Sequence, residues 1–155
     1  MITASKYGKQ ILDGMFTSTT NVAFPVTPWL GLFTTMPGAD GTGAVEVSAA
    51  EYGRLDLTKA GVHSKIYMAG AVVVDGTGDD AGKKVAKSTN QDEIHFQIIP
   101  AGGTWGTIVG FGIFDAATGG TPYFFGELTA PVATGSADNK TAVFFDIGDF
   151  VITLV

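Results

Sequence analysis

The hydrophobic pattern of this chain changes its period once, where the N-terminal segment gives way to the rest. Over residues 3–16 the apolar positions recur at helical spacing, which predicts a short amphipathic helix. The apolar face of that helix consists of Tyr7, Ile11, Leu12, Met15 and Phe16. Because two glycines, Gly8 and Gly14, interrupt the segment, we expect it to need a surface to dock on. Residues 1–28 are therefore predicted to be a helix and a connecting arm.

From Trp29 onward the pattern is typical of β-strands. Strands are predicted at 29–34, 52–57, 66–74, 93–99, 107–114, 123–128, 142–147 and 150–154, with glycine-rich breaks between them. The segment 93–99 alternates strictly, and 66–74 is apolar on both faces, as expected of a buried strand. About eight short strands without intervening helices predict an all-β fold, a jelly-roll-like antiparallel β-sandwich spanning residues 29–155. The pattern leaves jelly-roll and immunoglobulin-like strand orders open.

The strand predicted at 107–114 has a face made of glycine. Val109 and Phe111 lie on the face expected to fill the core, whereas Gly110 and Gly112 lie on the other. A glycine face lets a neighbouring backbone or aromatic ring approach closely. We expect either Trp105 or an aromatic side chain from a neighbouring strand to cover it.

The segment that follows this strand is predicted to be a hairpin turn. An aspartate side chain accepts hydrogen bonds from backbone N–H groups two residues further on, and glycine supplies the positive φ angles that close a hairpin. Asp115 is therefore interpreted as a turn residue, and Gly119 and Gly120 as the residues that close the turn.

Composition and charge narrow the possible functions more than the possible folds. The chain of 155 residues has a formal net charge of -6 and no cysteine. An acidic surface repels phosphate, so no nucleic-acid partner is expected. Without cysteine there is no disulfide, thiolate zinc site or cysteine nucleophile. No apolar run is long enough to span a membrane, and the N-terminus lacks a signal-peptide core, so no membrane partner is expected.

Residues that could carry out chemistry are few. No nucleophile elbow accompanies His63 or His95, so no catalytic residue is assigned. Asp75, Asp79 and Asp80 supply oxygen atoms in one loop, but the glutamate that completes an EF-hand loop is missing. A solvated turn is the simpler interpretation, and no metal or cofactor is predicted. Only 15% of the residues are charged, which is typical of chains that bury surface in an assembly and also of compact sandwiches.

Three stretches of the sequence resemble a known protein family. They are WLGLFTTMPGADGTGAVEVSAAEYGRLDL (29–57), WGTIVGFGIFDAATGGTPYFFGELTAPV (105–132) and FFDIGDFVITLV (144–155). This order is similar to that of small tailed-bacteriophage virion structural proteins, which are often labelled tail-fibre or minor structural proteins. Some similar small β-proteins act as capsid cement.

The resemblance extends to individual positions. Those that match the family's motifs are Gly31, Leu32, Gly41, Thr42, Gly43, Glu46, Ser48, Tyr52, Arg54, Trp105, Gly106, Phe111, Gly112, Phe114, Asp115, Gly119, Gly120, Gly126 and Pro131. The chain departs from the family at Ala50-Glu51, where a glycine doublet is usual. Residues 58–92 are longer than the family pattern and contain the acidic loop, so we expect this insertion to be adapted to its own particle.

The resemblance implies a virion component made in the host cytoplasm, and three functions remain open. The first is a capsid decoration or cement protein that binds the outside of the head, stabilises the major capsid protein lattice and forms a homodimer or homotrimer. The alternative is a tail-fibre or baseplate component involved in attachment to a host receptor. The third is a small lectin or hydrolase that uses the aspartates of the loop at 75–80. The residues expected at assembly interfaces are Tyr7, Ile11, Met15, Phe16, Trp29, Met36, Asp79 and Asp80.

Overall fold

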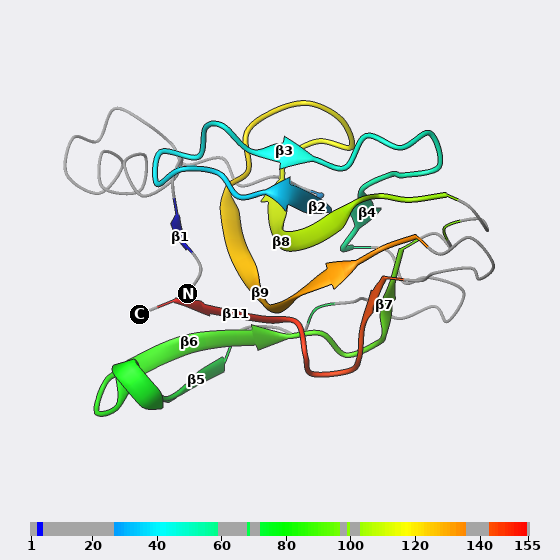
Figure 1. Cartoon of the computed structure of the whole chain (residues 1–155). Helices are drawn as coiled ribbons and strands as arrows, with labels where there is room; N and C mark the ends of the chain where they lie inside the picture. Colours follow the sequence, from blue (N-terminus) through cyan, green and yellow to red (C-terminus); the bar gives the residue numbers. More distant parts are fainter. Residues whose placement is uncertain are drawn as a thin grey trace.

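The computed structural model describes residues 3–4, 27–58, 68, 72–96, 99, 103–135 and 143–154. Within these residues the chain forms antiparallel sheets and a single 3-10 turn, η1 (Gly78–Asp80), so the all-β prediction is confirmed (Figure 1). This part of the chain contains no helix that is long and apolar enough to cross a membrane. The jelly-roll-like sandwich stays a prediction.

The largest sheet is built on the hairpin that the sequence predicts. Its strands are β8 (Thr107–Phe114) and β9 (Phe124–Ala133), flanked by β2 (Trp29–Thr35) and by the short β1 (Thr3–Ala4), β3 (Val45–Glu46) and β4 (Leu55–Asp56). The order is β1-β9-β8-β2-β3, and β4 also pairs with β2. The predicted strands at 29–34 and 107–114 are confirmed almost to the residue, because both combine strand-forming side chains with clear breaks.

Two smaller sheets lie beside the largest one. A three-stranded sheet has the order β11-β6-β5 and is formed by β5 (Val72–Asp75), β6 (Lys84–Thr89) and β11 (Val151–Leu154). A two-stranded sheet pairs β7 (Ile94–His95) with β10 (Phe144–Phe145). In Figure 1, β11 runs between β6 and β9, and the β5–β6 hairpin extends away from the largest sheet.

The predicted N-terminal helix is not supported. Thr3–Ala4 form a strand that pairs with Phe124 and Phe125 of β9, so the prediction of a helix is wrong for Thr3 and Ala4. A short segment interrupted by glycines has little helical stability of its own, whereas the edge of β9 offers ready backbone partners. Residues 5–26 lie outside the described residues, and Tyr7, Ile11, Met15 and Phe16 lie there with them.

Two further predictions about strands are wrong. The sequence predicts no strand between residues 74 and 93, yet Lys84–Thr89 form β6, the central strand of its sheet. Pairing with a strand on each side stabilises β6, although its side chains are mostly polar. The sequence also predicts a buried strand ending at Val74, but Val72 and Val73 are 57% and 73% exposed.

The core occupies both faces of the largest sheet. The larger cluster lies between that sheet and the two smaller ones and includes Leu30, Leu32, Ile94, Phe96, Trp105, Ile108, Phe111, Ile113, Val143 and Phe150. On the opposite face lies a smaller aromatic cluster of Phe33, Phe114 and Phe125. A shift in register between β8 and β9 places Ile108 rather than the predicted Val109 in the core, where Ile108 is fully buried.

The glycine face of β8 is covered at close range, as the sequence predicts. A Cβ atom on Gly112 would lie 2.7 Å from the ring of Phe33, and one on Gly110 would overlap with Met36. The aromatic side chain on this face therefore comes from the neighbouring strand β2. Trp105 lies instead in the larger core, where it is 4% exposed.

Candidate functional site

Several positions that match the family's motifs meet at one buried ion pair, formed by Glu46 of β3 and Arg54. The side chain of Arg54 is only 3% exposed. Its Nε donates to Glu46 Oε1 at 2.8 Å, and its Nη2 donates to Glu46 Oε2 at 2.6 Å. This two-pronged geometry requires the planar guanidinium of arginine, and a lysine ammonium cannot reproduce it.

The same guanidinium holds the hairpin turn between β8 and β9. Its Nη1 donates to the backbone oxygens of Ala116 at 2.8 Å and Gly119 at 2.7 Å. Its Cζ lies 3.3 Å from the centroid of the Phe114 ring. Arg54 thereby joins the loop after β3 to the turn after β8, and these contacts offset part of the cost of burying its charge.

Tyr52 completes this network. Its hydroxyl donates to Glu46 Oε1 at 3.0 Å and accepts from the backbone N–H of Leu32 at 2.8 Å. Burial raises the pKa of the Tyr52 hydroxyl well above its usual value, so the hydroxyl stays a donor. Gly31 leaves the room that the network needs, since a Cβ atom there would lie 2.8 Å from Glu46 Oε1.

The two glycines of this turn have the positive φ angles that the sequence predicts for them. Gly119 and Gly120 have φ angles of 67° and 76°, in the region that favours glycine. A Cβ atom on Gly120 would lie 2.9 Å from Asp115 Oδ1, so the carboxylate lies directly over the closing glycine. The motif residues of this region therefore form one connected structural unit, in which Glu46, Tyr52 and Arg54 act on one another and on backbone atoms.

A second buried polar centre, Asn90, follows β6 and is absent from the sequence-based predictions. Asn90 is 2% exposed. Its amide nitrogen donates to the backbone oxygens of Asp92 at 3.0 Å and Asp146 at 2.8 Å, and its amide oxygen accepts from the backbone N–H groups of Gly148 at 3.0 Å and Phe150 at 2.9 Å. These four bonds satisfy the whole amide and hold the turn before β11. A single asparagine in a polar stretch carries no signal that could have identified it.

Thr134 plays a similar role beside Trp105. Its Oγ1 accepts from the backbone N–H of Trp105 at 2.8 Å and donates to the oxygen of Gly106 at 2.6 Å. The Trp105 ring meets Tyr52 edge to face, with ring centroids 5.3 Å apart. Trp105 therefore connects the hydrogen bonds of Thr134 with the Arg54 network, through its ring contact with Tyr52.

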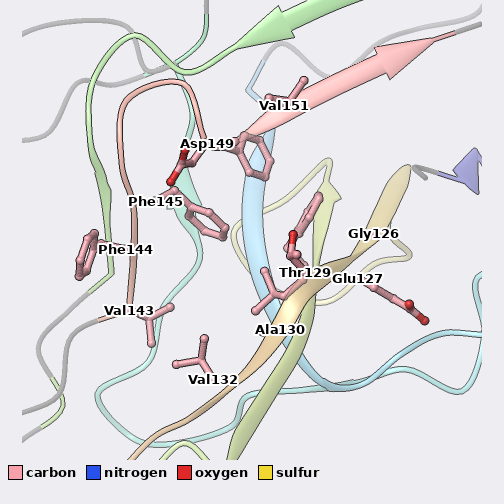
Figure 2. Close-up of a pocket in the computed structure, with 13 residues that line it drawn as sticks. Gly126, Glu127, Thr129, Ala130, Val132, Val143, Phe144, Phe145, Asp149 and Val151 are labelled. Atoms are coloured by element: carbon pink, nitrogen blue, oxygen red, sulfur yellow. The ribbon is translucent and has the colours of Figure 1, made fainter. Parts of the chain in front are cut away.

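A groove of about 520 Å³ lies between β9 and the β10–β11 segment (Figure 2). Its floor is formed by Phe111, Phe145 and Phe150, whose ring centroids are 4.9 to 6.4 Å apart. Val132 and Val143 line one end, as Figure 2 shows. The groove is therefore mainly apolar at its floor.

A bulge in β9 accounts for this groove. In the β8–β9 ladder, Ile108 pairs with Val132 and Gly110 pairs with Glu127, so residues 128–131 stand opposite Val109 alone. The extra residues bend β9 away from β8. Thr129 and Asp149 supply exposed polar side chains to the lining, whereas the side chain of Glu127 is directed away from the groove (Figure 2).

The residues predicted for assembly interfaces do not gather at one site. Trp29 and Met36 are half-buried and pack against the smaller aromatic cluster. Asp79 and Asp80 lie in η1 at the end of the β5–β6 hairpin, where Asp80 Oδ1 accepts from Lys83 Nζ at 3.0 Å. Asp75 pairs with Lys84 in the same hairpin.

Within the described ranges, no group of three metal-ligating side chains is close enough to hold an ion. His95 Nε2 lies 2.9 Å from Glu93 Oε2, and the His95 ring stacks on Phe144 with centroids 5.5 Å apart. His63 lies outside the described residues. His95 is thus placed by an exposed carboxylate and an aromatic ring.

One family model matches nearly the whole sequence. Its description is podophage GP4 fiber I protein gp80, and it aligns with residues 3–153. No match to a curated protein was found. The aligned range contains almost all of the three stretches that resemble phage proteins, so that resemblance is confirmed. The chain therefore belongs to the podophage GP4 fiber I protein gp80 family of bacteriophage virion structural proteins.

Proposed function

We propose that this protein is a structural subunit of the phage tail fibre. The observation that carries the proposal is the family match over residues 3–153, because the description of that family names a fibre protein. The sequence alone favoured a capsid cement protein, with the tail fibre as the alternative. The family favours the alternative, and capsid decoration has no comparable support.

The chemistry of the buried polar groups supports a structural role without catalysis. The two carboxylate oxygens of Glu46 are bonded to Arg54, and the amide of Asn90 is fully used by backbone atoms. Polar networks that are satisfied in this way make a fold rigid and specific. A fibre subunit needs that rigidity, since it transmits force along the particle's tail.

Exposed apolar side chains support a role in assembly. Those with large exposed fractions are Val45, Val72, Val73, Val132, Phe144 and Ile147. Of these, Val72 and Val73 are adjacent in β5, and contiguous exposed apolar surface is typical of interfaces. We therefore propose that the partners of this chain are other copies of itself and neighbouring tail proteins.

The location in the particle is tested by immunogold electron microscopy of purified virions with an antibody against this chain. We expect gold at the tail, and quantitative mass spectrometry should find far fewer copies than of the major capsid protein. An antibody against the major capsid protein is the control and should decorate the head. Gold over the head lattice, with copy numbers close to those of the capsid protein, would refute the fibre proposal in favour of cement. Absence from the virion would refute both.

A further inference from the structure

We propose that the groove between β9 and the β10–β11 segment binds an uncharged glycan, whose hydroxyl groups bond to Asp149, to Thr129 and to the bulged backbone of β9. The volume of the groove, about 520 Å³, lies in the range of small-ligand sites. Three properties of the lining carry the inference: polar groups that the fold does not use, apolar side chains beside them, and no basic residue among them. The inference goes beyond the role as a fibre subunit and does not depend on it.

The groove presents polar groups that the fold leaves unused. Thr129 and Asp149 are exposed, and in the part of the chain that the structure describes neither side chain forms a hydrogen bond or an ion pair. Residues 128–131 of the bulge stand opposite Val109 alone, so their backbone groups lack the regular partners of a ladder. A hydroxyl group both donates and accepts. A sugar with several hydroxyls can therefore bond to the carboxylate, the threonine and the backbone together.

Apolar side chains adjoin these polar groups. Figure 2 shows Val132, Val143 and Phe145 directed into the open space. The ring of Phe145 is half-buried and is held edge to face by the rings of Phe111 and Phe150. Its remaining surface is apolar, as are the C–H groups on the face of a sugar ring, and contact between them releases water. The groove therefore offers both kinds of contact that a sugar needs.

The lining argues against three other classes of occupant. An acidic ligand would find no lysine, arginine or histidine among the lining residues, and Asp149 would repel it. A wholly apolar ligand would cover polar groups without giving them partners. An extended peptide, or a strand of a second copy, needs a regular strand edge. The edge of β9 is bulged at this point and contains Pro131, and β11 contributes Val151 alone to the lining.

The acidic loop at 75–80 is a poorer candidate for the same ligand. Asp75 pairs with Lys84, and Asp80 pairs with Lys83, so two of the three carboxylates in this loop already have cationic partners. No residue of η1 is buried. The loop therefore offers mainly paired charges, whereas the groove offers free acceptors together with apolar surface.

The proposal is tested by NMR titration of the full-length, isotopically labelled protein with neutral hexasaccharides of glucose, galactose, mannose, rhamnose and N-acetylglucosamine. We expect at least one of them to shift the resonances of Thr129, Phe145 and Asp149 in a saturable manner, and a hexasaccharide of galacturonate to leave them unchanged. Asp149→Ala should weaken binding by about tenfold or more, because it removes a charge-assisted acceptor. Asp146→Ala is the matched control, since Asp146 is exposed in the same turn but does not line the groove. Thermal melting would establish that both variants are folded.

Three results would overturn the proposal. The first is the absence of saturable shifts with every neutral hexasaccharide up to about 10 mM. The second is binding that Asp149→Ala leaves unchanged, or shifts confined to the loop at 75–80, because the sugar would then lie outside the groove. The third is a shift of the groove resonances with protein concentration alone, which would assign the groove to a second copy of the chain. The immunogold result for the tail would be unaffected in each case.

Discussion

Removing the side chain of Arg54 is expected to cost more stability than any surface substitution in this protein. In Arg54→Ala, Glu46 keeps a carboxylate that is only 24% exposed and loses both of its charged bonds. The backbone oxygens of Ala116 and Gly119 lose their donor in the same step. Breaking a buried ion pair by deleting one partner costs about 3–5 kcal/mol. For a domain of this size, that loss lowers the melting temperature by roughly 6–20 °C.

The reasoning is tested with urea denaturation of the wild type and of three variants, Arg54→Ala, Glu46→Gln and the double variant. An uncompensated buried charge, rather than a missing contact, makes the single deletion costly. The double variant should therefore lose clearly less free energy of unfolding than the sum of the two single variants. A loss below about 1 kcal/mol in Arg54→Ala, the value for a surface ion pair, would refute the reasoning. Strict additivity in the cycle would refute it as well.

Three further predictions concern other buried positions. Asn90→Ala removes four hydrogen bonds to the backbone, although the Gly148 N–H and the Asp146 oxygen each keep a second backbone partner. Calorimetry should therefore show a loss of about 2–4 kcal/mol, and a loss typical of a surface position would contradict the role of Asn90 in holding the turn before β11. Gly112→Ala places a methyl group against the ring of Phe33 and should cost about 1–3 kcal/mol in denaturant unfolding, whereas Gly53→Ala, with open space around it, should be near neutral. The raised pKa of Tyr52 means that the folded state holds this proton more tightly than the unfolded state. The stability it contributes is complete below the unfolded pKa of about 10 and is lost as the pH rises above it, so unfolding curves at increasing alkaline pH should fall more steeply for the wild type than for Tyr52→Phe.

The sequence by itself determined the elements that depend on short-range pattern. The β8 strand, its glycine face and the turn at Asp115–Gly120 were all predicted from local alternation and from the preferences of aspartate and glycine. The family was likewise recognisable from motifs read along the chain. These features need no knowledge of what lies across the fold, because the information is contained within a few neighbouring residues.

The tertiary structure decided the role of each polar motif residue. Arg54 reaches backbone oxygens that lie 62 and 65 residues away, and Asn90 reaches one that lies 56 residues away. In the sequence, Arg54 lies within a predicted strand, and Asn90 lies between two predicted strands. Only the folded chain brings partners to them, and a polar side chain is buried stably only where such partners are present.

The tertiary structure also decided which apolar residues remain exposed. The apolar run ending at Val74 predicts a buried strand, yet β5 is an edge strand with Val72 and Val73 in solvent. The groove between β9 and the β10–β11 segment depends on the bulge in β9, and no local sequence pattern predicts that bulge. The sequence shows which side chains are hydrophobic and therefore gain free energy from burial. The arrangement of the sheets determines whether a neighbour covers those side chains. Where it does not, the uncovered surface is available to another molecule.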